Sequence, residues 1–288
     1  MMKKKKNKKL PFIIIFLLGF GIMLYPIISR MYYRVESGKE IESFDKKASE
    51  LPNEEVLKRI ELARAYNRTL DPSKLADPYT EKEKEGIKEY ARMLEIKEKI
   101  GHIEIPAIDQ DIPIYAGTSE SILQKGAGHL EGTSLPVGGE STHTVITAHR
   151  GLPTAKLFTD LNKLQKKDQF YIHNIEGVLA YEVDQIKVVE PSNFDDVLVV
   201  EGKDYATLLT CTPYMINSHR LLVRGHRIPY NPQILGQGSQ VTSFIKHKDY
   251  LMFSIPITVV LLAIFIFLKR EVRTLNKKLG EIRKDEDK

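Results

Sequence analysis

Two long runs of apolar residues without a single charge constrain this chain most strongly. Residues 10–29 form a run of 20 and residues 250–268 form a run of 19. A helix of about 20 apolar residues crosses the hydrocarbon core of a bilayer. Both runs are therefore predicted to be transmembrane helices, and the segment 30–249 between them must lie on one side of the membrane.

The basic residues beside these runs predict which side that is. Residues 1–9 are rich in lysine, and Lys269 and Arg270 follow the second run directly. Basic flanks stay in the cytoplasm, so the tails 1–9 and 269–288 are predicted to be cytoplasmic and the segment between the helices extracellular. Residues 1–9 carry +6 and residues 269–288 carry +3, so the net charge of +5 leaves about −4 on the body, which lacks the basic face that nucleic-acid binding requires. We expect a multi-pass protein of the cell membrane with no nucleic-acid partner.

Each apolar run also has a second interpretation. The first could be a cleaved signal peptide, but it is long for one, and "PIISRMYY" offers no small-x-small cleavage site. The second could belong to a wall-sorting signal, but residues 231–249 before it contain no Leu-Pro-x-Thr-Gly-like pentapeptide. Two uncleaved transmembrane helices are therefore favoured, with residues 231–249 as a linker.

Residues 30–99 are predicted to be a charged, helical N-terminal extension. A helix is expected after residue 52, with acids in its first turn and an apolar side that includes Ile60 and Ala63. A second helix over 80–96 begins with a capping box. The segment 70–80 between them, "LDPSKLADPYT", contains two Asp-Pro steps and is predicted to be a stiff loop, because proline excludes its predecessor from helical conformation.

From about residue 100 the pattern changes to short alternating segments joined by Gly, Pro, Asn and Asp. Many short strands without long helices between them predict a closed or nearly closed antiparallel β-barrel over 100–230. The expected strands are an alternating stretch around Ile103 and Ile105, then 143–149, 169–174, 178–190, 197–200, 205–211 and 220–227.

The single cysteine, Cys211, lies at the end of an apolar, β-branched run in the predicted extracellular segment. Extracellular cysteines are usually paired, so a lone one is a reactive thiol, an intermolecular link or a small buried apolar residue. A thiol nucleophile needs a nearby base or cation, and acyl transfer needs a group that stabilises the developing oxyanion.

His149 and Arg220 are candidates for those two duties. His149 follows the strand-like "TVITA", at a strand end where a barrel presents side chains on its rim. Arg220 opens the strand after Cys211, so the loop "TPYMINSH" would bring both to the same end of the barrel, where arginine can bind an oxyanion. Arg224 is explained more simply by a surface ion pair. For any one histidine a structural duty is the alternative, and His219 lies closer to Cys211 in sequence.

Three separated motifs make a family likeness specific. The segments "VITAHRG", "TLLTCTP" and "HRLLVRG", with the upstream "GAGHLEGTSLPVGG", resemble the sortase family of Gram-positive bacteria. The resemblance covers about 100–230 and implies a mainly β fold, the sortase-type closed antiparallel barrel with short helices. It implies that Cys211 is the nucleophile, His149 the proton shuttle and Arg220 the transition-state stabiliser. It also implies that Thr210 positions the substrate or the oxyanion.

Two features outside the barrel resemble class C, the pilin-polymerising sortases. One is a second transmembrane helix after the domain. The other is a lid of Asp-Pro-aromatic type, here Asp77, Pro78 and Tyr79, where many relatives carry Phe or Trp at the last position. Such a lid would pair Asp77 with Arg220 and cover Cys211 with the tyrosine ring until substrate displaces it.

The implied activity is transpeptidation. The enzyme would cleave a Leu-Pro-x-Thr-Gly-like sorting motif through a thioester and join the product to an amine, by resemblance a pilin lysine. The expected partners are sorting motifs of pilins or surface proteins, the acceptor lysine and the lipid bilayer. No cofactor or metal is expected, because the chain has one cysteine, no His-x-x-x-His spacing and no nucleotide-binding motif.

Three alternatives stay open at this point. A housekeeping sortase would share the three catalytic residues but join proteins to peptidoglycan. A thiol endopeptidase would hydrolyse its substrate and transfer nothing. A catalytically silent barrel would bind pilins as a scaffold.

Overall fold

The computed structural model describes residues 10–70 and 91–232, with isolated positions between 258 and 274. The chain divides into two compact units, residues 1–230 and residues 231–288. The predicted lid residues 77–79 and most of the predicted second membrane helix lie outside the described residues.

One helix, α1 (Leu10–Ser49), begins in the first apolar run and continues well beyond it. Among the described residues it is the one helix long and apolar enough to cross a membrane, judged over Ile15–Ser49. Large apolar side chains near its start, such as Phe16 and Ile22, are exposed. Farther along, Ser37, Ile41 and Phe44 recur at helical spacing and are buried. The first part of α1 is therefore apolar on all sides and exposed, whereas its second part buries one face.

The second half of α1 packs on the barrel along a contact that we call the α1 seam (Tyr33–Asp45 of α1 against residues 99–125). Tyr33 Oη donates a 3.0 Å hydrogen bond to the carbonyl of Lys125, and Arg34 pairs with Asp109. Glu40 of α1 forms an ion pair with Lys99. The seam fixes the direction in which the chain leaves the barrel toward the apolar run.

The helix α2 (Asn53–Asn67) confirms the predicted apolar side, because Ile60 and Ala63 are fully buried. Its C-terminal residue Asn67 exchanges two hydrogen bonds with the backbone of Leu135, 3.2 and 2.7 Å long. The Asn67 side chain thus satisfies both the N–H and the carbonyl of Leu135, as a neighbouring strand would, and holds α2 on the barrel.

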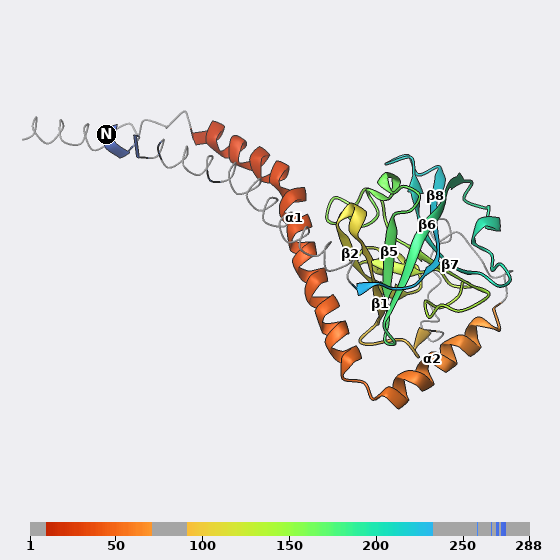
Figure 1. Cartoon of the computed structure of the whole chain (residues 1–288). Coiled ribbons are helices and arrows are strands. Elements are labelled where there is room, and N and C mark those ends of the chain that lie inside the picture. The colour runs from red at the N-terminus through yellow and green to blue at the C-terminus, as the bar shows by residue number, and fades with distance from the viewer. Residues whose placement is uncertain are drawn as a thin grey trace, which may run out of the picture. The chain divides into compact units, whose positions relative to one another are not determined.

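Eight strands close a barrel in the order β1-β2-β3-β4-β7-β8-β6-β5 (Figure 1). Short helices occupy the connections, as predicted. The strands are β1 (Lys99–Ile105), β2 (Gln110–Ala116), β3 (Ala127–His129), β4 (Thr142–Thr147), β5 (Gln169–His173), β6 (Val178–Val189), β7 (Asp204–Thr212) and β8 (His219–Ile228). The short helices are η3 (Pro106–Ile108), α3 (Glu120–Leu123), η4 (Leu161–Lys163) and η5 (Asp195–Val197).

The expectation of a wholly antiparallel barrel is wrong for two pairs, because β2 pairs with β3 and β4 pairs with β7 in parallel. The β5–β6 hairpin follows β4 in the sequence but pairs with neither β4 nor β7. The chain therefore enters β7 at the end of the barrel where β4 began, and the two strands run parallel. The predicted strand 197–200 is also wrong. Val197 ends η5, and Val199 and Val200 that follow it are exposed and make no strand pairing.

The alternation of side chains separates two apolar clusters. The barrel interior contains Ile146 of β4, Leu208 of β7 and Val223 of β8. A smaller cluster on the outer face of the same three strands, which we call the outer cluster, takes the intervening positions. It consists of Leu130, Val145, Val197, Leu209 and Leu222, with Val189 and Phe194 packed against it.

Candidate active site

Cys211 of β7 and Arg220 of β8 lie directly opposite each other in the antiparallel ladder. Two residues deeper in the same ladder, Leu209 faces Leu222, and both belong to the outer cluster. Because every second residue of a strand shares a face, Cys211 and Arg220 also point to the outer side of the barrel wall. Both are buried there, outside the barrel interior. The short β7–β8 loop brings the two residues to the same end of the barrel, as the sequence predicted, and the structure adds that they pair directly.

His149 reaches the same place from β4. The last parallel pair between β4 and β7 is Thr147 with Leu209, and the amide of Ala148 donates to the carbonyl of Leu209. His149 is two residues beyond Thr147, as Cys211 is two residues beyond Leu209. The two side chains therefore leave neighbouring strands at the same level and on the same face. The structure brings His149, Cys211 and Arg220 together at one end of the barrel.

Thr210 differs from the other three predicted site residues because it faces the barrel interior. Its Oγ1 donates a 2.7 Å hydrogen bond to the carbonyl of Ala148, the residue before His149. Thr210 is fully buried. Its side chain therefore links β7 to β4 next to the cysteine and the histidine.

The Arg220 guanidinium is held by the loop that precedes it. Its Nη1 donates 3.0 Å hydrogen bonds to the carbonyls of Asn217 and His219. Arginine remains charged at every accessible pH, so a fixed positive charge lies across the ladder from the thiol. A nearby cation favours the thiolate form of cysteine, which is the reactive one.

Arg224, on the same face of β8, has a different environment. It forms a two-pronged ion pair with Asp184, with both N–O distances at 3.0 Å, and lies 4.2 Å above the Tyr205 ring. Burial lowers the pKa of Arg224, but Asp184 outweighs it and the net shift is upward. This confirms the ion pair that the sequence suggested for Arg224.

Glu120, the first residue of α3, was missed by the sequence reasoning. Its Oε1 lies 3.2 Å from Nε2 of His149 and also accepts a 2.9 Å hydrogen bond from Gln124. Nothing in the pattern marks it, because a four-residue helix carries no periodicity and the two partners are 29 residues apart in the chain. A carboxylate at this nitrogen holds the imidazole ring in one orientation.

Arg150 is a second residue that sequence reasoning passed over. Its guanidinium contacts Thr212 Oγ1 at the end of β7, Asn162 Oδ1 and the carbonyl of Thr159. These contacts fasten the loop after His149 to the strand that carries Cys211. Arg150 stands directly after His149 in the motif "AHRG", but nothing in the local sequence pattern indicates which residues it contacts.

Three other described histidines occupy structural positions. His219 follows the opposite face of β8 from Arg220, and its Nε2 lies 3.2 Å from a carboxylate oxygen of Glu190. Burial lowers the pKa values of His129 and His143 to about 4, so both rings are neutral. Each ring is hydrogen-bonded to a backbone carbonyl.

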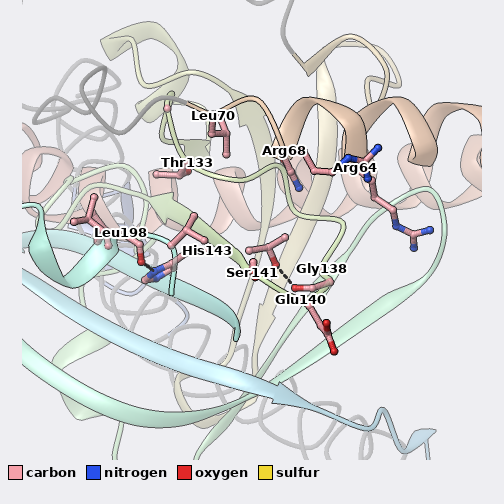
Figure 2. Close-up of a pocket in the computed structure, with 15 residues that line it drawn as sticks. Arg64, Arg68, Leu70, Thr133, Gly138, Glu140, Ser141, His143 and Leu198 are labelled. Carbon is pink, nitrogen blue, oxygen red and sulfur yellow. Dashed lines mark hydrogen bonds between the residues drawn. The ribbon is translucent and has the colours of Figure 1, made fainter. Parts of the chain in front are cut away.

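A cavity of about 670 Å³ lies at the opposite end of β4. Figure 2 shows Arg64 of α2 and Arg68 just after it on one side and His143, bonded to the carbonyl of Leu198, on another. His143 and His149 are six residues apart along an extended chain, about 20 Å. The cavity is therefore separate from the cysteine site. Within the described residues, no three of His, Cys, Asp and Glu are grouped to hold a metal ion.

The comparisons with known proteins agree with this geometry. The sortase domain model matches residues 103–228. Sortase C-1 from Streptococcus pneumoniae is 63% identical with a TM-score of 0.65, and the match covers 67% of this chain and 100% of that chain. The pilus-related sortase C of Group B Streptococcus is 62% identical with a TM-score of 0.64, covering 66% of this chain and 97% of that chain.

A more distant curated relative is sortase A from Bacillus anthracis. It is 27% identical over 182 residues, which cover 63% of this chain and 80% of that protein. The class C structures are thus more than twice as similar in sequence as this sortase A. From these matches, the chain belongs to the sortase family of cysteine transpeptidases, in class C.

Proposed function

We propose that this sortase polymerises pilins, with Cys211, His149 and Arg220 as its catalytic residues. The observation that carries the proposal is the cross-strand pair of Cys211 and Arg220, with His149 at the same level of the neighbouring strand. The similarity to the pilus-related sortase C of Group B Streptococcus supports the choice of substrate.

The first half of the reaction forms a thioester. The thiolate of Cys211 attacks the Thr–Gly carbonyl of a Leu-Pro-x-Thr-Gly-like motif, and the carbonyl π electrons move to the oxygen. Arg220 donates hydrogen bonds to that oxyanion. The intermediate collapses with cleavage of the C–N bond, and His149 gives a proton to the leaving amine of glycine.

The second half transfers the acyl group. A lysine amine of the next pilin attacks the thioester carbonyl, His149 accepts the proton of the amine, and the Cys211 sulfur leaves. An isopeptide bond results and the enzyme returns to its starting state. Dividing one difficult substitution into two steps through a covalent intermediate is the advantage of the nucleophile.

The membrane arrangement is part of the proposal. The apolar run 10–29 and the run 250–268 would both span the bilayer, with the barrel domain 100–230 outside the cell. The continuity of α1 from the apolar run into the α1 seam supports this placement. A sorting substrate held in the same membrane would then meet the enzyme without free diffusion through the medium.

A lid formed by Asp77, Pro78 and Tyr79 completes the proposal and rests on the resemblance of "ADPYT" to class C lids. If this segment covers Cys211, replacing both Asp77 and Tyr79 by alanine should raise the turnover of a sorting peptide. Steady-state cleavage of a fluorogenic peptide measures this, and unchanged turnover would contradict the lid.

The decisive experiment traps the thioester. The full-length chain in detergent micelles is mixed with a Leu-Pro-x-Thr-Gly peptide, and the protein mass is read by mass spectrometry. The wild type should gain the mass of the acyl fragment, and Cys211→Ala should gain none. His219→Ala is the matched control, since His219 is adjacent to Arg220 but faces the other way, and it should form the adduct. An adduct on Cys211→Ala would refute the nucleophile assignment.

The acceptor amine separates pilin polymerisation from the housekeeping alternative. The trapped thioester is offered a lysine-containing pilin segment and, separately, the peptidoglycan precursor lipid II. Faster transfer to the lysine supports the proposal, and faster transfer to lipid II would favour attachment to the cell wall. Release of free acid without transfer to either amine would indicate an endopeptidase.

A further inference from the structure

The strand β6 is longer than the neighbour that covers it. β5 pairs with β6 from Val178 to Glu182, and backbone hydrogen bonds at Val183 extend this contact by one residue. From Gln185 to Val189, β6 pairs only with β8. Within the described part of the chain, the other edge of this segment has no strand beside it. We call residues 185–189 the β6 edge.

Two side chains of the β6 edge are apolar and exposed. Ile186 is 37% exposed and Val188 is 59% exposed. Their partners across the ladder are Val223 and Leu221 of β8, which belong to the barrel interior. The apolar stripe that fills the barrel thus continues past the end of β5, where no other described strand covers it.

An exposed strand edge is usually protected by a charge, most often a lysine. The only basic residue on the β6 edge is Lys187, between Ile186 and Val188. Its Nζ lies 2.5 Å from Asp196 Oδ1, and so the charge is drawn to the opposite face of the strand. The side that carries the two aliphatic residues therefore lacks this protection.

The β6 edge ends level with the catalytic residues. Val189 of β6 pairs with Arg220 of β8, and Arg220 pairs with Cys211 of β7, so the three form one row across the sheet. Neighbouring strands are about 4.8 Å apart, which places Val189 about 10 Å from Cys211 along the row. A chain added beside β6 would run about 15 Å from Cys211.

We propose that the β6 edge is the docking site for an extended segment of the acceptor protein, which adds one strand to the sheet beside β6. Main-chain hydrogen bonds would hold the segment, and its alternate apolar side chains would pack on Ile186 and Val188. The proposal deepens the proposed function and rests on it.

The acceptor is the occupant that this position favours. The donor chain is joined to Cys211 on the outer face of β7 and β8, whereas the β6 edge lies on the far side of β8 from β7. A chain that must reach the thioester from elsewhere can start at this edge. The 15 Å gap corresponds to about five residues of extended chain, so the acceptor lysine would lie about five residues from the docked segment.

Two acceptor peptides test the proposal. One is Val-Thr-Val-Thr-Val-Gly-Ser-Gly-Ser-Lys, and the other has serine in place of each valine. The full-length wild type in micelles should use the valine peptide with a KM at least 5-fold lower. Ile186→Lys with Val188→Lys should abolish that preference, because charges on this face oppose strand addition, while transfer to hydroxylamine keeps its kcat.

The matched control is Leu57→Lys with Leu62→Lys on α2. These two leucines are 58% and 52% exposed, so the control adds the same charges to a similarly exposed apolar pair. It should keep the preference for the valine peptide. An equal KM for both peptides in the wild type, or a preference that survives the β6 substitutions, would overturn the docking proposal.

Two other results would point elsewhere. If the wild type transfers nothing to hydroxylamine, the proposed function itself fails, which the peptide comparison does not require. If the wild type sediments as a dimer and the β6 double variant as a monomer, with unchanged KM for both peptides, the edge pairs two copies of this chain and the acceptor proposal is wrong.

Discussion

His102 in the α1 seam and His149 at the candidate active site both lie beside carboxylates, yet their environments differ. The His102 side chain is 4% exposed, with Nδ1 2.7 Å from Asp111 and Nε2 3.2 Å from Asp45 of α1. The His149 side chain is 20% exposed, with Nε2 beside Glu120. Both nitrogens of His102 are therefore occupied, Nδ1 by Asp111 of β2 and Nε2 by Asp45, and the second contact holds α1 on the barrel. His149 is open enough to meet a substrate.

The buried histidines show how the partner decides the charge of such a ring. Burial by itself disfavours a charged imidazole, but Asp111 and Asp45 outweigh it and raise the pKa of His102 to about 9. The ring also stacks on His173 with 4.1 Å between centroids. His129 and His143 are hydrogen-bonded to backbone carbonyls instead, and burial lowers their pKa values to about 4. A carboxylate beside a histidine is therefore found at a charged structural histidine as well as at a candidate catalytic one. What distinguishes His149 is its position near the thiol of Cys211.

The largest effect is expected at the catalytic end, from Arg220→Ala. Removing a donor to a developing oxyanion costs about 100- to 1000-fold in kcat. Arg220→Lys keeps the charge but loses the planar guanidinium group, so its kcat should lie between those of Arg220→Ala and the wild type. The rate of thioester formation in a single turnover measures both. A decrease of less than about 5-fold for the alanine variant, with an unchanged thermal midpoint, would remove Arg220 from the mechanism.

The second-largest effect is expected at acid pH, where protonation of the neutral buried histidines should lower the stability of the fold. The folded-state pKa of His129 and of His143, about 4, lies below the unfolded value of 6.5. Their stabilising contribution is thus complete above pH 6.5 and is lost as pH falls toward 4. Each should remove about 2–3 kcal/mol from the free energy of unfolding over that range. Urea unfolding of His143→Gln should show a shallower acid decline than the wild type, and an equal slope would contradict the assignment.

At the α1 seam the pH dependence should be reversed, because raising the pH should lower the stability that His102 contributes. The folded-state pKa of His102, about 9, lies above the unfolded value of 6.5. Its stabilisation is complete below pH 6.5 and is lost as pH rises through 9. Because Asp45 and Asp111 are about half exposed, we expect a discounted loss of about 1–2 kcal/mol.

His102→Asn should flatten the alkaline side of the stability curve and leave the acid side as in the wild type. Urea unfolding at pH 6.5 and pH 9.5 measures the difference. The comparison would break if His143→Gln flattened the alkaline side as much, since the two histidines would then not be distinguished by their partners.

Local sequence patterns accounted for most of the strands but for only part of their pairing. Alternation predicted β4, β5, β6, β7 and β8, because a strand with one face in the core repeats every two residues. The placement of Cys211 and Arg220 at one end of the barrel also followed from sequence, because a short loop joins their strands, although the exact cross-strand pairing did not. The parallel pairing of β4 and β7 did not, since no local pattern records which distant strand is the neighbour.

Contacts between distant side chains were beyond local patterns for the same reason. Asp45 and His102 are 57 residues apart, and Glu120 and His149 are 29 apart. The strand β3 was missed because its three residues, Ala127–His129, are too few for an alternating pattern. The family motifs located His149 without its orienting carboxylate, since Glu120 lies outside each motif that carries the resemblance.

The smallest effect is expected from Glu120→Gln, which sharpens the contrast between the two histidines. Glu120 is 60% exposed, and exposed ion pairs contribute about 1 kcal/mol or less. The glutamine keeps the length and an acceptor oxygen but loses the charge. We expect kcat for peptide transfer to fall about 3- to 5-fold with KM unchanged, because the carboxylate orients the ring and does not touch the peptide. Gln124→Ala, which removes the other partner of Glu120, should leave kcat within 2-fold. If both variants lowered kcat equally and shifted the thermal midpoint, Glu120 would serve the stability of α3, and the orientation of His149 would depend on other contacts.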